Sequence, residues 1–295
     1  MGTSELLQQF VNALSLGSTY ALLALGLAMV FSVMGLVNFA YGELVAVTGY
    51  TMYLLVTRGV PWWIAMLCGI AAAVVLSLLM ERIAFRPLRN ASFLTLLFSS
   101  FAVSVIIQNV FRATVSPRQK GVPSPDFLSE VVHLGPLTAS WLTVITTAVA
   151  AASLATLVVF LRRSVAGVSM RAAAEDFDVT RLMGVKANSV IALAFAISGL
   201  LAGIAGVLWV ARLGSVAPHM GFVPVLKAFI ATVIGGLGSL QGAVFGGFVL
   251  AFIEITFHVI LPSSLQPMVD PFALLIVGVI LYFKPQGLLG SSGGM

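Results

Sequence analysis

The sequence predicts an all-α, polytopic integral membrane protein with about eight transmembrane helices, some of them discontinuous. Of its 295 residues 60% are hydrophobic and only 8% are charged, and the mean hydropathy is +1.09. A soluble domain of this composition would have too little polar surface to cover its core. The apolar segments are long and lack the alternation of transmembrane β-strands, so helices are the structure that satisfies their backbone groups in lipid.

Six apolar segments are long enough to cross a bilayer as helices, which takes about 20 residues each. They are residues 9–34, 39–56, 62–80, 93–111, 141–161 and 189–211. Residues 225–260 are long and interrupted by glycine, and the last apolar segment, residues 272–283, is short. We expect a half-helix at 224–234, a break at IGGLGSLQG and a full span at 243–260, because irregular backbone is tolerated at membrane depth where it is buried or lines a cavity.

Basic residues predict the orientation of the chain. Three arginines in residues 82–89 follow the third segment, and five basic residues in residues 162–186 follow the fifth. Both loops fall on one side if the segments alternate, and the positive-inside rule assigns that side to the cytoplasm. The amino terminus and the proline-rich sequence SPRQKGVPSPDF are then outside. Lys284 favours a cytoplasmic carboxyl end, which the split of residues 225–260 allows.

The most charged part of the chain is residues 162–187. This segment holds eight charged residues, out of 15 basic and 10 acidic residues in the whole chain. Helix formers from Arg171 to Asp176 and from Asp178 to Leu182 predict a short amphipathic helix at the membrane surface, and Gly184 can end it in the left-handed conformation. Such a helix is either a connector or a docking element. We expect residues 1–295 to form a single transmembrane domain that contains this loop.

Two carboxylates lie inside apolar segments, where a charge costs at least about 2.5 kcal/mol. Glu43 is either an interfacial group near a helix start, favoured there by the helix dipole, or a group that faces a wet path. Glu254 has Lys227 and His258 as candidate partners. The glycines at 238, 242 and 246 have the spacing of a ridge for close helix packing, or of a surface on which a gate slides.

Signatures of enzymes and metal sites are missing from the sequence. It has no G-x-x-x-x-G-K-[ST] phosphate loop and no H-E-x-x-H zinc motif, so we expect no catalytic residue and no ATP site in this chain. One cysteine, Cys68, which we expect to be a small buried residue, and three histidines predict no metal and no cofactor. In a membrane protein the net charge of +5 indicates on which side of the membrane the basic loops lie, rather than binding to nucleic acid.

Four stretches resemble the permease subunits of branched-chain amino acid ABC importers. SMRAAAEDFDVTRLMGVKANSVIALAFAISGLLAGIAGVL is similar to a cytoplasmic loop and the following span of that family. NALSLGSTYALLALGLAMVFSVMGLVNFAYGELVAVTGY, FIATVIGGLGSLQGAVFGGFVLAFIE and FKPQGLLG also resemble it, in the family's order. They cover well over half of the chain. Tyr41 stands where family members often carry His, which puts a proton-linked role of that position in doubt.

The resemblance implies a multi-pass subunit of the bacterial inner membrane that moves branched-chain amino acids inward by alternating access. Its implied partners are a second homologous permease, two cytoplasmic ATP-binding subunits that use the ATP, and a periplasmic substrate-binding protein. The loop would be a coupling helix that contacts the ATPases through Arg171, Ala174, Glu175, Asp176, Arg181 and Gly184. Importers of urea, short amides or small carboxylates remain alternatives, as does a stand-alone secondary transporter.

Two helix breaks are candidates for a substrate path, because free backbone amides and carbonyls could guide the carboxylate and ammonium of an amino acid. The candidate residues are Asn38, Tyr41 and Glu43 at one break, Gly235, Gly236, Gly238 and Ser239 at the other, and Glu254. In the alternative, selectivity resides in the binding protein and the permease lines a nearly neutral path. Mutations there would then slow transport more than they change specificity.

Overall fold

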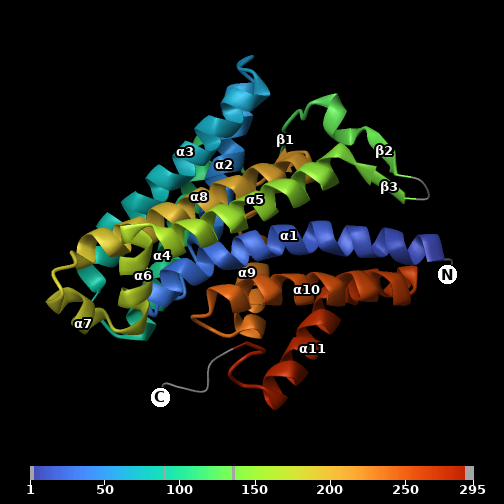
Figure 1. Cartoon of the computed structure of the whole chain (residues 1–295). Coiled ribbons are helices and arrows are strands. Elements are labelled where there is room, and N and C mark those ends of the chain that lie inside the picture. The colour runs from blue at the N-terminus through green and yellow to red at the C-terminus, as the bar shows by residue number, and fades with distance from the viewer. Residues whose placement is uncertain (1–2, 90, 135–136, 290–295) are drawn as a thin grey trace.

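The computed structural model describes residues 3–89, 91–134 and 137–289, and these form a bundle of helices with two small strand pairs at one end (Figure 1). Seven helices in this part of the chain are long and apolar enough to cross a membrane. The polytopic all-α prediction is therefore confirmed. The helices are α1 (Thr3–Met34), α2 (Tyr41–Val56), α3 (Trp62–Met80), α4 (Phe93–Thr114), α5 (Trp141–Arg163), α6 (Val165–Glu175), α7 (Phe177–Leu182), α8 (Ala187–Leu213), α9 (Phe222–Gly235), α10 (Leu240–Ile260) and α11 (Val269–Phe283).

The strands and short turns connect these helices. At the end of the bundle where α1 begins, two antiparallel pairs form, β1 with β4 and β2 with β3 (Figure 1). Gln8 of α1 reaches this end through a hydrogen bond from its Nε2 to the carbonyl of Thr138, 2.6 Å. The bounds are Lys120–Gly121 for β1, Val131–Leu134 for β2, Leu137–Ser140 for β3 and Ser215–Val216 for β4, with a π-helical turn at Glu81–Phe85 and 3₁₀ turns at Arg86–Leu88, Asp126–Ser129 and Ser263–Met268.

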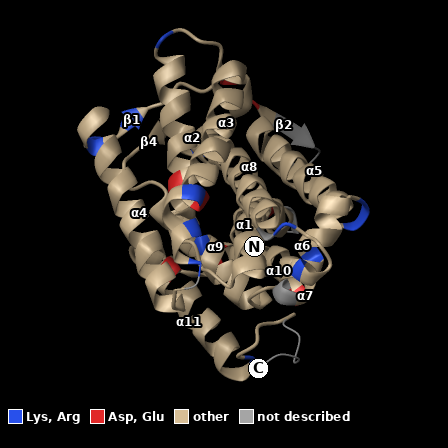
Figure 2. Cartoon of the chain, turned by 90° about the vertical axis from the view of Figure 1, so that its left-hand side faces the viewer, with Lys and Arg blue, Asp and Glu red and all other residues tan. Residues whose placement is uncertain are grey.

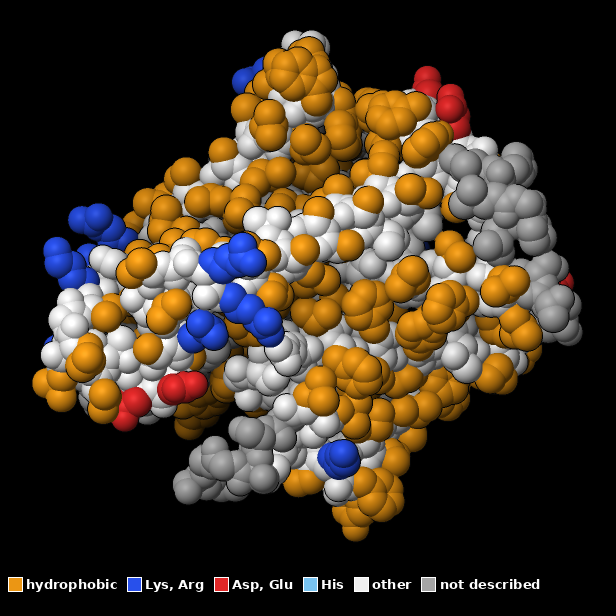
Figure 3. All heavy atoms as spheres, in the orientation of Figure 1, with side chains coloured by type: hydrophobic (Ala, Val, Ile, Leu, Met, Phe, Trp, Pro, Cys, Tyr) orange, Lys and Arg blue, Asp and Glu red, His pale blue; other side chains and the backbone are white. Residues whose placement is uncertain are grey.

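Helices α1 and α8 form the centre of the bundle. Over an apolar stretch of 18 residues, 83% of the residues of α1 and 72% of those of α8 are buried. In the other five helices of membrane length, the buried share of such a stretch is 17–33%. Large apolar side chains on α3, α4 and α11 are exposed, as expected for helices that face lipid, and in Figure 3 hydrophobic side chains cover the middle of the molecule. Cys68 of α3 is exposed, so the prediction that it is buried was wrong. A peripheral helix turns one of its sides to the lipid.

The glycine-broken region has the predicted form of a half-helix, a break and a full span. The half-helix α9 ends at Gly235, and Gly236 and Gly238 have φ of 108° and 89°, which a residue with a side chain rarely adopts. Ser239 then caps α10, because its Oγ accepts a hydrogen bond from the amide of Gly242 at 3.0 Å. Gly238 lies in the turn before α10. The predicted ridge of three glycines on one helix is therefore wrong, because only two of the three, Gly242 and Gly246, lie on α10.

The two ends of the bundle differ in charge. Arg82, Arg86 and Arg89 lie at the end of the bundle that carries α6 and α7, and Arg89 hydrogen bonds there to Glu81 and to Asn188 of α8. Figure 2 views the molecule from this end, with basic residues near α6 and α7, and in Figure 3 basic side chains gather on the same side. The two arginine-containing loops thus lie at one end, as alternating spans predict.

Candidate functional site

The charged segment folds into two short helices rather than the single helix expected. Ser164 begins α6, accepting a hydrogen bond from the amide of Gly167 at 2.9 Å, and α6 ends at Glu175. Asp176 has an extended backbone, and its Oδ1 accepts a hydrogen bond from the amide of Val179 at 3.0 Å, which starts α7. An aspartate is a good amino-terminal cap and a poor interior residue, so the chain bends at this position.

The six residues for which the resemblance implied ATPase coupling are all exposed. Met170 and Ala173 of α6 are 2% and 4% exposed and face the bundle, whereas Leu182 and Met183, at the end of α7, are 86% and 80% exposed. Gly184 closes α7 with φ of 84°, as its sequence position predicted. The segment therefore presents a surface of charged and apolar side chains away from the bundle. Its exposed candidates are Arg171, Ala174, Glu175, Asp176, Arg181 and Gly184.

A cavity of about 570 Å³ lies between this segment and the turn that joins α9 to α10. Arg171, Ala174 and Glu175 of α6 form one wall, and Gly238 and Ser239 of the turn form another. The structure thus brings together residues that the sequence assigned to two different roles. Helix α1 completes the cavity with Met29, Ser32 and Val33, so α6, the turn and the central helix share one space.

The other two glycines of the break are buried beneath the end of the described chain. Leu288 donates its amide hydrogen to the carbonyl of Ile234 at 2.7 Å, and Leu289 donates its amide hydrogen to the carbonyl of Gly235 at 3.0 Å. Two carbonyls that a helix end would leave free are therefore already occupied. Ile234 and Gly235 thus hold the carboxyl-terminal segment in place.

The first break places its three candidate residues between α2, α1 and α4. Asn38 is 1% exposed, and its Oδ1 accepts a hydrogen bond from the amide of Ala40 at 3.0 Å. Glu43 is also 1% exposed, and its Oε1 accepts hydrogen bonds from Ser104 and Gln108 of α4, both at 2.8 Å. The Tyr41 hydroxyl is buried and has no hydrogen-bond partner in the described part of the chain.

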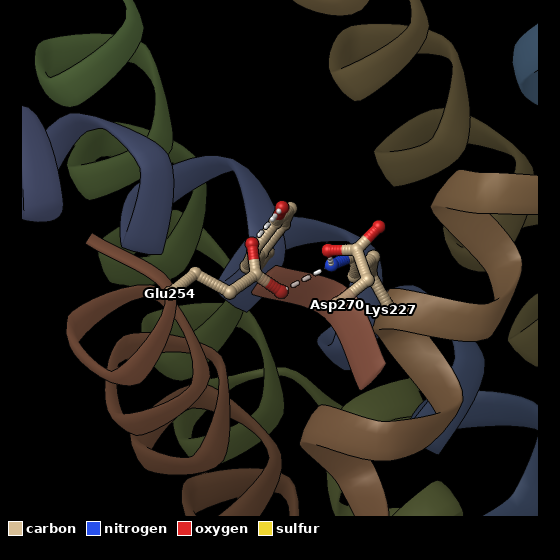
Figure 4. A network of polar contacts seen from close by, with 4 residues as sticks. Lys227, Glu254 and Asp270 are labelled. Carbon is tan, nitrogen blue, oxygen red and sulfur yellow. Dashed lines mark hydrogen bonds and ion pairs between the residues drawn. The ribbon is translucent and has the colours of Figure 1, made fainter. Parts of the chain in front are cut away.

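Glu254 belongs to a buried ionic cluster that joins four helices (Figure 4). Lys227 of α9 forms an ion pair with Glu254 of α10 and a second one, at 2.6 Å, with Asp270 of α11. The hydroxyl of Tyr20, on α1, donates a hydrogen bond to the other oxygen of Glu254 at 2.8 Å. Lys227 was one of the two partners predicted for Glu254. The other, His258, contacts Gln266 instead.

The partners of Glu43 and two members of this cluster were not predicted. Asp270 precedes the short last apolar segment, and a carboxylate at that boundary was the available signal in the sequence. Tyr20 lies 234 positions from Glu254, and nothing in the local sequence indicates that they meet. Ser104 and Gln108 are one helical turn apart on α4, a spacing that places both on one face.

The eight path candidates therefore occupy separate places. Gly42, beside Tyr41 and Glu43, packs against Gly221 just before α9 begins, whereas Gly235 lies at the other end of α9. A helix of 14 residues is about 20 Å long. Glu254 joins Lys227 between these two points. The residues line no common pocket among the described cavities.

These features define a class: a polytopic α-helical membrane protein with a half-helix inside the bundle and an exposed charged segment at one end. Among the described residues no group of His, Cys, Asp and Glu could hold a metal ion. The family model described as branched-chain amino acid transport system / permease component matches residues 9–284. The chain belongs to this family and is a multi-pass protein of the inner membrane, a component of a transport system.

Two relatives match over nearly their whole length and a third over about a third of it. The chain is 34% identical to the high-affinity branched-chain amino acid transport system permease protein BraD of Pseudomonas aeruginosa, covering 96% of this chain and 95% of the relative. It is 36% identical to the corresponding protein LivH of Escherichia coli K12, with the same coverage. The ribose import permease protein RbsC of Escherichia coli K12 is 31% identical over 113 residues, which are 36% of this chain and 35% of RbsC. No solved structure matches the chain.

Proposed function

We propose that this chain is the membrane-spanning permease subunit of an ATP-driven importer that moves branched-chain amino acids into the cell by alternating access. Support comes from two relatives named as high-affinity branched-chain amino acid permeases, each covering 96% of the chain. The sequence contains no phosphate loop, so the energy comes from partner subunits. The complex comprises a second homologous permease, two cytoplasmic ATP-binding subunits and a periplasmic substrate-binding protein.

One observation carries this proposal: the exposed α6–α7 segment shares a cavity of about 570 Å³ with the α9–α10 turn and α1. In the proposed mechanism the ATP-binding subunits dock on the segment through Leu182 and Met183 and the charged residues beside them. ATP binding draws these subunits together and displaces α6. The displacement closes the cavity against Gly238 and Ser239, and α9 and α10 tilt with α1. A bundle with two packings would then alternate between outward-open and inward-open states.

Affinity purification in mild detergent tests the docking site. Glu175→Arg combined with Asp176→Arg reverses two charges on the exposed segment, and we expect the two ATP-binding subunits to be lost while the second permease stays bound. Asp176→Asn separates charge from capping, because asparagine caps a helix about as well as aspartate. Glu130→Arg is the matched control, since this exposed carboxylate lies at the opposite end of the bundle.

The alternatives give different results. If the wild-type chain purifies alone and still transports a substrate in liposomes, it is a stand-alone carrier and the importer proposal is wrong. If the complex assembles, uptake of radiolabelled leucine, isoleucine and valine is compared with that of urea, acetamide and lactate. Uptake of only the latter group would overturn the proposed substrate class and leave the subunit role intact.

A further inference from the structure

A second cavity lies near the opposite end of the bundle from α6, where α1, α5 and α8 meet. Its volume is about 200 Å³. Helix α5 begins at its rim, where the Oγ of Ser140 accepts a hydrogen bond from the amide of Thr143 at 3.3 Å. Thr146 lies six residues further along, so the cavity reaches about 9 Å inward along this helix. The wall consists of five hydroxyl-bearing side chains, one cation and three apolar side chains, namely Ser15, Thr19, Ser140, Thr143, Thr146, Arg212, Leu142, Leu208 and Trp209.

The hydroxyl groups inside the cavity have unused hydrogen-bonding capacity. Ser15, Thr19 and Thr146 are 6%, 3% and 5% exposed, although they lie on helices rich in apolar residues. The hydroxyls of Ser15 and Thr146 form no hydrogen bond with any described residue, and that of Thr19 bonds only the carbonyl of Ser15, at a long 3.3 Å. These oxygens open onto the cavity rather than into packed protein. A polar ligand in the cavity would satisfy them.

Arg212 is the only charged side chain on the wall of this cavity. It lies in the last turn of α8, is exposed, and forms no ion pair or hydrogen bond with a described residue. The start of α5 adds to its field, because the amino-terminal end of a helix carries a partial positive charge. The rim of the cavity therefore attracts an anion, whereas its interior offers neutral hydroxyls.

We propose that this cavity is a binding site for a free α-amino acid, which occupies it on entry from the outer side of the membrane. Arg212 binds the carboxylate, for which the planar guanidinium fork is suited. The hydroxyls of Ser15 and Thr146 accept hydrogen bonds from the ammonium group. Trp209, with Leu142 and Leu208, contacts the aliphatic side chain. The inference rests on the proposed function and adds to it a substrate contact outside both helix breaks.

The chemistry of the wall also discriminates between substrate classes. A neutral ligand such as urea or a short amide would leave Arg212 without a counter-charge. The pairing of Lys227 with two carboxylates and the hydrogen bonds that already engage Glu43 make those groups less available for a zwitterion. The geometry therefore favours a ligand with a carboxylate.

Binding of radiolabelled L-leucine to the full chain in nanodiscs tests the site directly. Arg212→Gln removes the charge, and we expect the affinity for L-leucine to fall at least about tenfold. This is the size of effect expected when a hydrogen bond to a charged group is lost. Thr146→Val keeps the shape and removes one hydroxyl, with an expected loss of about three- to tenfold. L-leucinamide, which lacks the carboxylate, should compete at least about tenfold more weakly than L-leucine with the wild type. Arg58→Gln is the matched control, an exposed arginine outside the cavity, and should bind as the wild type does.

Failure of this site and failure of the proposed function are distinguishable. The site is wrong if the wild-type chain binds no L-leucine, if Arg212→Gln binds as tightly as the wild type, or if L-leucinamide competes as well as L-leucine. In each case import by the complex with its ATP-binding subunits is measured separately. Import of leucine in that assay leaves the proposed function standing without the site, whereas absence of import of all three branched-chain amino acids overturns the function as well.

Discussion

Lys227 joins α9 to α10 and α11 through two ion pairs. Its side chain is 10% exposed and lies between Glu254, whose side chain is 5% exposed, and Asp270, which reaches the surface. The ammonium group is 5.8 Å from the centre of the Tyr20 ring. A buried carboxylate without a counter-charge is costly, so the lysine makes the position of Glu254 tolerable.

We predict that Lys227→Met lowers the free energy of unfolding by about 3 kcal/mol, because it leaves Glu254 buried without its cation. Combining it with Glu254→Leu should recover part of the loss, since both buried charges are then replaced by apolar groups. Thermal unfolding of the purified protein in detergent measures both effects. Lys284→Met, at an exposed lysine, is the control and should change stability by less than about 0.5 kcal/mol. If Lys227→Met and the wild type unfold at the same temperature, the ion pair is not formed in the membrane protein.

The geometry of the α9–α10 hairpin depends on small residues. A Cβ at Gly235 would overlap the carbonyl of Gly242, and a Cβ at Gly246 would overlap the carbonyl of Ala231. The two backbones touch, which is possible only where side chains are absent. The same hairpin carries Lys227 and Glu254 and, in its turn, Gly238 and Ser239. The hairpin therefore carries both part of the ionic cluster and one wall of the cavity beside α6.

We predict that Gly246→Ala destabilises the protein by about 1–3 kcal/mol, because overpacking forces the two backbones apart. Gly278→Ala is the matched control. This glycine lies in the interior of α11 with no atom within 4 Å of an added Cβ. The control should be neutral or stabilise by up to about 1 kcal/mol, as alanine is the better helix former. Unfolding curves in detergent that coincide for the two variants would contradict the packing described for α9 and α10.

At the scale of the whole molecule, charge and exposed apolar surface are segregated along the bundle. Apolar side chains cover the middle, the α6–α7 segment and three arginines lie at one end, and the strand pairs lie at the other (Figures 1 and 3). Basic loops favour the cytoplasmic side of a membrane. The proposed orientation therefore has α6 and residues 284–289 inside, and the strands with the amino-terminal end of α1 outside.

Labelling of single cysteines in intact cells tests this orientation. In a Cys68→Ser background, Arg118→Cys near β1 should react with a membrane-impermeant maleimide added to whole cells. Val165→Cys, at a position 86% exposed on α6, should react only after the cells are permeabilised. The reverse pattern would place the α6–α7 segment outside, where cytoplasmic ATP-binding subunits could not reach it.

Local sequence determined the helices and the points at which they end. An apolar run of about 20 residues has to form a helix in lipid, so most spans were predicted within a few residues. The half-helix, the glycine break and the exposed charged segment also follow from short-range chemistry. Asp176 as a cap and Gly184 as a helix end act within one turn of the chain.

Tertiary packing alone decided which of these elements meet. The hydrogen bond from Tyr20 to Glu254 spans 234 positions, and the burial of Glu43 against Ser104 and Gln108 spans more than 60. Neither contact follows from a local sequence pattern. Apolar helices in a membrane associate through close packing of small residues rather than through hydrophobicity. The same reason explains why the cavity that joins α6 to Gly238, and the hydroxyl-lined cavity around Arg212, emerge only once the helices are assembled.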